Sequence, residues 1–249
     1  MLDGYPLRKY DWKDWLLMAI ASSLALQLIS MYLTVNLVSM FSRDFSEETL
    51  LVWTMRGTVL GAILSLPLTL LVIHLRKIPL LNRKGLSKEE SFIIRGISKD
   101  DWKFLAKYIP ISYVLYIAGS VFLTNILGES EPINQVAIES MFDYVPLWQM
   151  FIMIVIVAPI AEELLFRGIL LFPGDKQNTT WLRLIISAVL FGLVHSPTDI
   201  LSAYTYIGMG FIFSYAAKKR GSVEVAIVYH FANNLFGFVQ ILLFRALFS

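Results

Sequence analysis

The chain has 249 residues, of which 57% are hydrophobic and only 16% are charged, and its formal net charge is +2. Soluble domains usually carry about a quarter charged residues, so this composition is typical of a protein solvated largely by lipid. The sequence contains no cysteine, which excludes disulfides, cysteine-ligated zinc and thiol nucleophiles. It also has no long block of like charge that would indicate nucleic-acid binding.

Apolar segments long enough to form transmembrane helices run along the whole chain. A helix needs about 20 apolar residues to cross a hydrocarbon core roughly 30 Å thick. The candidate spans are residues 15–41, 51–75, 103–127, 146–172, 181–196, 200–217 and 223–248. The first is too long for the apolar region of a signal peptide, so we expect it to remain as an anchoring helix. The sequence predicts an all-α, polytopic transmembrane helix bundle of about seven spans.

The fifth and sixth spans are short, and Ser196-Pro-Thr-Asp199 separates them. Because proline cannot donate a hydrogen bond within a helix, this segment predicts a break in or near the membrane. A broken or re-entrant segment near residues 196–200 would raise the number of spans to eight.

Lys and Arg residues predict the orientation of the spans. Nine of them lie in residues 76–107, whereas residues 128–145 have none. Basic loops stay on the cytoplasmic side, so we expect a multi-pass protein of the cell membrane with a cytoplasmic N-terminus. We expect one membrane domain, residues 1–249, in which residues 1–144 form N-terminal spans with a charged cytoplasmic segment at 76–107. The apolar cluster 92–94 in that segment favours a helix at the inner membrane surface.

The fourth span places two adjacent carboxylates deep in an apolar helix, within the sequence Pro159-Ile-Ala-Glu-Glu-Leu-Leu-Phe-Arg167. Ionisable groups at this depth are unfavourable and face a cavity or a partner. Helical spacing puts Glu163 and Arg167 on one face, where they can form an ion pair. Glu162 points about 100° away around the helix, which leaves its carboxylate free to act as a general base. Pro159 is expected to loosen or kink the helix just before this pair.

Two later spans carry imidazole groups at helical spacing. Phe191 and His195 lie one turn apart, as do His230 and Asn234. At about 1.5 Å per helical residue, counting from the inner end of each span puts both histidines, Asn234 and Glu162 in one band of depth. We therefore expect these side chains to meet in one cavity, as a hydrolytic site would require.

Together these motifs resemble the CPBP family, the bacterial Abi-type relatives of the type II CAAX prenyl protease. The family pattern is Glu-Glu-x-x-x-Arg, then Phe-x-x-x-His, then His-x-x-x-Asn. In this chain it corresponds to Glu162 through Arg167, Phe191 through His195, and His230 through Asn234. The resemblance covers roughly residues 145–249, and the N-terminal spans do not take part in it.

The resemblance implies a glutamate-type intramembrane endopeptidase that acts on a membrane-associated peptide or protein. The resemblance also implies a role for each matching residue. Glu162 and His195 would activate a water, and His230 and Asn234 would form the oxyanion hole. Glu163, Arg167 and Phe191 would support the site. Hydrogen-bond donors fixed where negative charge develops stabilise the transition state strongly in a dry site.

Three other interpretations compete with this one. A buried Glu163–Arg167 pair that only fixes helix packing would leave Glu162 unexplained. Zinc could be held by a glutamate and two histidines, but the sequence lacks His-Glu-x-x-His and Asn234 suits an oxyanion hole better, so we expect no metal or cofactor. A non-catalytic membrane scaffold could act as a bacteriocin immunity factor or regulate a membrane sensor kinase. The expected partners are the lipid bilayer and a peptide or membrane-protein substrate, without nucleic acid.

Overall fold

The computed structural model describes residues 10–21, 23–41, 46–78, 80, 96–128, 133–172 and 179–248. All secondary structure in these ranges is helical, which confirms the predicted all-α bundle. Among the described residues, five helices are long and apolar enough to cross a membrane, so the chain is a multi-pass membrane protein. They are α3 (Glu47–Arg76), α4 (Lys99–Leu127), the composite helix Leu147–Leu171, α9 (Ile200–Arg220) and α10 (Val223–Phe248).

The fifth predicted span is the short helix α8 (Trp181–Val194). Its 14 residues extend about 21 Å, less than a hydrocarbon core of roughly 30 Å, so α8 is too short to span that core. The predicted break is confirmed, because residues 195–199 belong to no helix. Asp199 then begins α9 as its cap, and its carboxylate accepts a 2.6 Å hydrogen bond from the Ser202 N–H.

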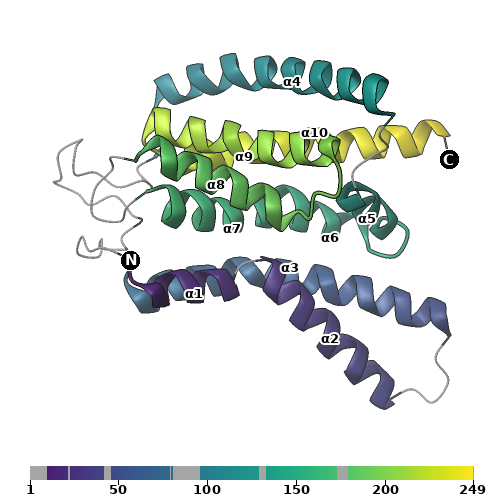
Figure 1. Ribbon diagram of the computed structural model, residues 1–249. Coiled ribbons are helices and arrows are strands. Elements are labelled where there is room, and N and C mark those ends of the chain that lie inside the picture. The colour runs from purple at the N-terminus through teal and green to yellow at the C-terminus, as the bar shows by residue number, and fades with distance from the viewer. Residues whose placement is uncertain are drawn as a thin grey trace.

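The first predicted span is wrong as a single helix. It consists of α1 (Trp12–Ala21) and α2 (Ser23–Phe41), which diverge in direction (Figure 1). The carbonyl of Ala21, at the end of α1, accepts a 3.1 Å hydrogen bond from the Thr69 hydroxyl of α3. Packing against α3 therefore supplies a partner where α1 ends.

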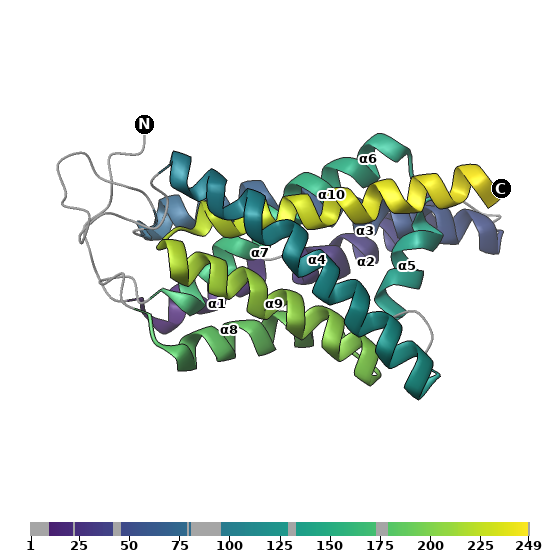
Figure 2. The same cartoon turned by 90° about the horizontal axis from the view of Figure 1, so that it is seen from above.

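The helices form layers. In Figure 1, α4 lies on one side, α9 and α10 lie next to it, α7 and α8 follow, and α1, α2 and α3 lie on the far side. Figure 2 shows α4 crossing over α9 and α10. The short helix α5 (Ile133–Met141) lies where the sequence indicated only a loop. The predicted surface helix around residues 92–94 lies outside the described residues.

The fourth predicted span is one continuous helix with two π-helical stretches. Its parts are α6 (Leu147–Phe151), η1 (Ile152–Val157), α7 (Ala158–Leu165) and η2 (Phe166–Leu171). The first π-helical stretch ends just before Ala158 and Pro159, which agrees with the expectation of a disturbed helix there. Such stretches are rare in proteins as a whole, but those that occur often lie at functional sites. Here they flank α7, which bears Glu162 and Glu163, and the second stretch itself contains Arg167.

Candidate active site

A fully buried ion pair lies at the centre of the bundle. The Arg167 Nη1 atom donates to Glu163 Oε1 at 2.8 Å, one helical turn apart, which confirms the predicted pair. The same Glu163 oxygen lies 2.9 Å from Nδ1 of His230 on α10. Glu163 thus joins α7 to α10 as well as neutralising Arg167.

The remaining donors of Arg167 reach α9. Nη2 donates to the Gly210 carbonyl at 2.7 Å, and Nε donates to the Ser214 hydroxyl at 3.2 Å. Ser214 in turn donates to Ser187 of α8, whose hydroxyl bonds the carbonyl of Phe166. A buried charge is tolerated when it is both paired and hydrogen-bonded, so this network lets Arg167 fix three helices together.

Glu162 faces His195 rather than the buried pair. Its Oε2 atom lies 4.0 Å from His195 Nε2, too far for a direct hydrogen bond. His195 Nδ1 lies 2.8 Å from the carbonyl oxygen of Phe191. A carbonyl only accepts, so Nδ1 carries the hydrogen and the neutral ring presents Nε2 as an acceptor. The side chains of Glu162 and His195 are 17% and 19% exposed, whereas Glu163 and Arg167 are fully buried.

Aromatic rings hold both histidines. His195 stacks on Tyr206 with 4.7 Å between ring centroids and 13° between planes, and His230 stacks on Phe213 at 4.6 Å and 21°. The ring of Phe191 contacts both imidazoles, and the Arg167 guanidinium lies 4.6 Å from its centroid. Phe191 therefore contacts the buried cation and both imidazoles.

Asn234 lies one turn beyond His230 but bonds a different helix. Its amide donates to the Ile154 carbonyl of η1 at 2.8 Å. In the π-helical stretch the N–H of Ala158 is bonded to Met153 instead of Ile154. The next residue, Pro159, has no N–H to offer. The Asn234 side chain thus supplies the hydrogen bond that the helix backbone does not give to Ile154.

The structure brings together most of the predicted site residues. Glu162 meets His195, and Glu163, Arg167 and His230 form one cluster beside Phe191. Asn234 is joined to this group through η1 and not through a contact with Glu162. Tyr206, Ser214 and Gly210 were missed by the sequence interpretation. The small residues of α9 are typical of close helix packing in membranes, and this was the available signal.

Among the described residues, no group of three or more His, Asp or Glu side chains could hold a metal ion together. The expectation that no metal or cofactor takes part stays a prediction. Chelation combined with metal analysis of the purified protein tests it.

The matching region of a known family coincides with these helices. Residues 144–236 match the family described as type II CAAX prenyl endopeptidase Rce1-like. This region of the chain is similar to that family. The matching region runs from before α6 into α10 and contains every predicted site residue.

Several bacterial proteins are similar to the chain. The protein named "Putative membrane peptidase YdiL" of Bacillus subtilis is 38% identical over 122 residues, which is 48% of each chain. YyaK, an uncharacterized protein of the same species, is 37% identical over 84 residues, 30% of this chain and 28% of YyaK. The UPF0177 protein YbdI of Lactococcus lactis is 29% identical over 135 residues, 53% of this chain and 72% of YbdI. The chain therefore matches half or less of the length of YdiL and YyaK. No solved structure matches it.

Proposed function

We propose that this protein is an intramembrane endopeptidase that hydrolyses a peptide bond in a membrane-associated peptide or protein. The main observation in support is that Glu162 lies beside His195 and apart from the neutralised Glu163–Arg167 pair. A carboxylate and an imidazole that share one small space within apolar helices suit activation of a water. The peptidase family of residues 144–236 agrees with this chemistry.

In the proposed reaction one water contacts both Glu162 Oε2 and His195 Nε2. Their 4.0 Å separation leaves each atom within hydrogen-bond reach of a shared water. The water transfers a proton to this pair as its oxygen attacks the carbonyl carbon of the scissile peptide bond. The proton is then delivered to the amine that leaves.

His230 and Asn234 are the proposed donors to the oxyanion. Because His230 Nδ1 is bound to Glu163, its Nε2 atom is the one left to face the substrate. To donate to the oxyanion, this Nε2 atom must carry a hydrogen. An amide has two N–H donors, so Asn234 keeps one beyond its bond to Ile154.

We further propose that residues 145–249 form the catalytic core. The N-terminal spans 1–144 would then complete one domain around it. In this proposal the protein lies in the cell membrane with its N-terminus in the cytoplasm, as the distribution of Lys and Arg predicts.

The test compares peptides released from membranes that contain the wild-type protein or the Glu162→Gln or His195→Ala variant. Matched controls are Glu48→Gln and His74→Ala, at exposed positions of α3. We expect peptides that appear with wild type and both controls and are absent from both site variants, at equal protein levels in the membrane. The same peptides from Glu162→Gln membranes would disprove hydrolysis by this site and favour a binding role.

A further inference from the structure

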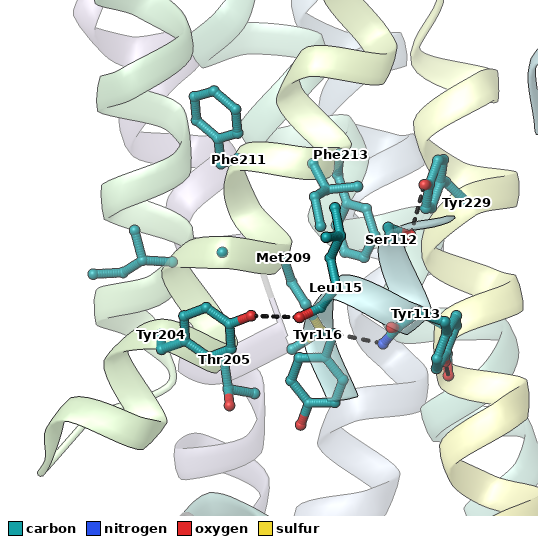
Figure 3. Close-up of a pocket in the computed structure, with 14 residues that line it drawn as sticks. Ser112, Tyr113, Leu115, Tyr116, Tyr204, Thr205, Met209, Phe211, Phe213 and Tyr229 are labelled. Carbon is teal, nitrogen blue, oxygen red and sulfur yellow. Dashed lines mark hydrogen bonds between the residues drawn. The ribbon is translucent and has the colours of Figure 1, made fainter. Parts of the chain in front are cut away.

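A cavity of about 390 Å³ lies between α4, α9 and α10 (Figure 3). None of the described residues that line it is charged. The lining residues come from α4, from α9 and, with Tyr229 and Asn233, from α10, and they lie within these helices and not at their ends. The surroundings at this depth are lipid hydrocarbon, so a ligand that enters the cavity must be largely apolar.

Three of the four tyrosines that line the cavity donate their hydroxyl hydrogens between α4 and its neighbours. Tyr113 donates to the Asn233 carbonyl at 2.9 Å, Tyr204 to the Leu115 carbonyl at 2.9 Å, and Tyr229 to the Ser112 hydroxyl at 2.8 Å. Figure 3 shows the last two of these bonds. These bonds hold α4 against α9 and α10.

Two polar groups in the lining lack good partners. Thr205 is only 6% exposed, and its hydroxyl has no hydrogen-bond partner within the described part of the chain. The Asn233 amide meets only the Met209 sulfur at 3.2 Å and the Asn234 side-chain oxygen at 3.3 Å. A buried hydroxyl normally finds a partner, so Thr205 indicates a ligand that offers one. The half-buried Asn233 amide, which also lines the cavity, can exchange its weak sulfur acceptor for the same ligand.

The chemistry of these two groups favours a peptide over a lipid chain. A peptide carries a hydrogen-bond donor and an acceptor at nearly every residue, whereas a lipid acyl chain has none in the middle of the bilayer. The cavity also adjoins the candidate active site. Thr205 precedes Tyr206, which stacks on His195, and Phe213 lines the cavity while it stacks on His230.

We propose that this cavity binds an apolar, membrane-embedded segment of the peptide substrate, and that Thr205 and Asn233 hydrogen-bond its main chain. The proposal rests on the proposed endopeptidase function for the identity of the ligand as substrate. Binding itself does not require cleavage, so the two can be tested separately.

Two glycines provide a matched pair of positions for the test. Gly208 lines the cavity, and a Cβ atom placed there meets no other atom within 4 Å. Gly237 of α10 is equally open but does not line the cavity. Because the chain has no cysteine, Gly208→Cys and Gly237→Cys each introduce a single thiol. Both are made in the Glu162→Gln protein, so that a bound peptide is not cleaved.

The probes are a transmembrane peptide of leucine and alanine with one central cysteine, and a phosphatidylcholine with a thiol at the end of one acyl chain. Disulfide formation is followed in proteoliposomes. We expect the peptide to cross-link to Gly208→Cys about tenfold faster than to Gly237→Cys, a difference of about 1.4 kcal/mol. Adding Thr205→Val should remove most of that preference. The lipid should react equally at both positions.

Equal rates with the peptide at the two positions, or a preference of the lipid for Gly208→Cys, would overturn the proposal. A second variant avoids reliance on the cysteine proteins: Gly208→Leu should raise the KM for a membrane-embedded substrate, whereas Gly237→Leu should not. If Glu162→Gln still cleaves peptides while the cross-linking preference holds, the proposed catalytic site fails and the binding site stands. If cleavage depends on Glu162 but the peptide shows no cross-linking preference for Gly208→Cys, the proposed catalytic site stands and the proposed binding site fails.

Discussion

Tyr206 shows how a single residue can orient the candidate base. Its ring lies nearly parallel to the His195 imidazole, and the Phe191 carbonyl fixes the opposite nitrogen of that imidazole. Together these contacts leave His195 one orientation in which Nε2 faces Glu162. The stacking is therefore expected to affect the chemical step more than substrate binding.

We expect Tyr206→Leu to lower kcat by up to about tenfold with little change in KM, because aromatic pairs contribute about 0.5–1.5 kcal/mol beyond their burial. Tyr206→Phe keeps the ring and should retain most of the activity. Nitrogen-15 NMR of His195 gives a readout that does not depend on activity: the leucine variant should lose the single Nδ1–H form. Equal kcat for both variants would show that the stack does not position the base.

At the scale of residues, the sequence predicted pairs along one helix and, from depth, the approach of Glu162 to His195. It missed the partners of Arg167 and Asn234 on other helices. Glu163 and Arg167 are four residues apart, so helical geometry alone predicts their contact. The bonds of Arg167 to Gly210 and of Asn234 to Ile154 depend on how helices pack, which spacing within one helix does not encode. Sequence spacing likewise gave no sign that His230 would bind Glu163.

The contact between α8 and α9 depends on glycine. A Cβ atom at Gly210 would lie 2.5 Å from the Ala188 carbonyl oxygen of α8. The helices approach closely at the residue whose carbonyl receives Arg167. Any separation of α8 from α9 would also move His195, which follows α8, relative to Glu162.

We expect Gly210→Ala to destabilise the protein by about 1–3 kcal/mol through overpacking, and to lower activity. Gly208→Ala is the matched control one half-turn earlier, where a Cβ has open space. In a helix, alanine is favoured over glycine by about 1 kcal/mol, so the control should be neutral or more stable. Thermal unfolding in detergent measures the stability of both variants. An unchanged melting temperature for Gly210→Ala would contradict the close contact between α8 and α9.

A second element-level prediction concerns the π-helical stretch before Pro159. Asn234→Ala should destabilise the protein by about 1–3 kcal/mol, since it leaves the buried Ile154 carbonyl without a donor. Pro159→Ala restores a backbone N–H near that carbonyl. The double variant should therefore lose less stability than the sum of the single changes, by at least about 0.5 kcal/mol. Strict additivity in this double-mutant cycle would mean that Asn234 does not replace the proline N–H.

Helix positions were more predictable than helix shapes. Hydropathy locates each span because lipid demands apolar residues over a fixed length. The division between α1 and α2 and the π-helical stretches depend on tertiary hydrogen bonds such as Thr69 to Ala21, which hydropathy does not report. The break at residues 195–199 was predictable because Pro197 and the Asp199 cap are local signals.

At the scale of the whole molecule, the helix ends fall into two groups. In Figure 1 the end of α9 lies at one end of the bundle, and the beginning of α3 lies at the other. The excess of Lys and Arg predicts that the first of these ends is cytoplasmic.

Single cysteines introduced as Lys219→Cys and Glu48→Cys, both at exposed positions, report on the two ends in a chain without native cysteine. A membrane-impermeant maleimide should label Glu48→Cys in intact cells and Lys219→Cys only after permeabilisation. Reversed labelling would invert the predicted orientation, and labelling of both from outside would mean that the helices between them do not cross the membrane as the structure suggests.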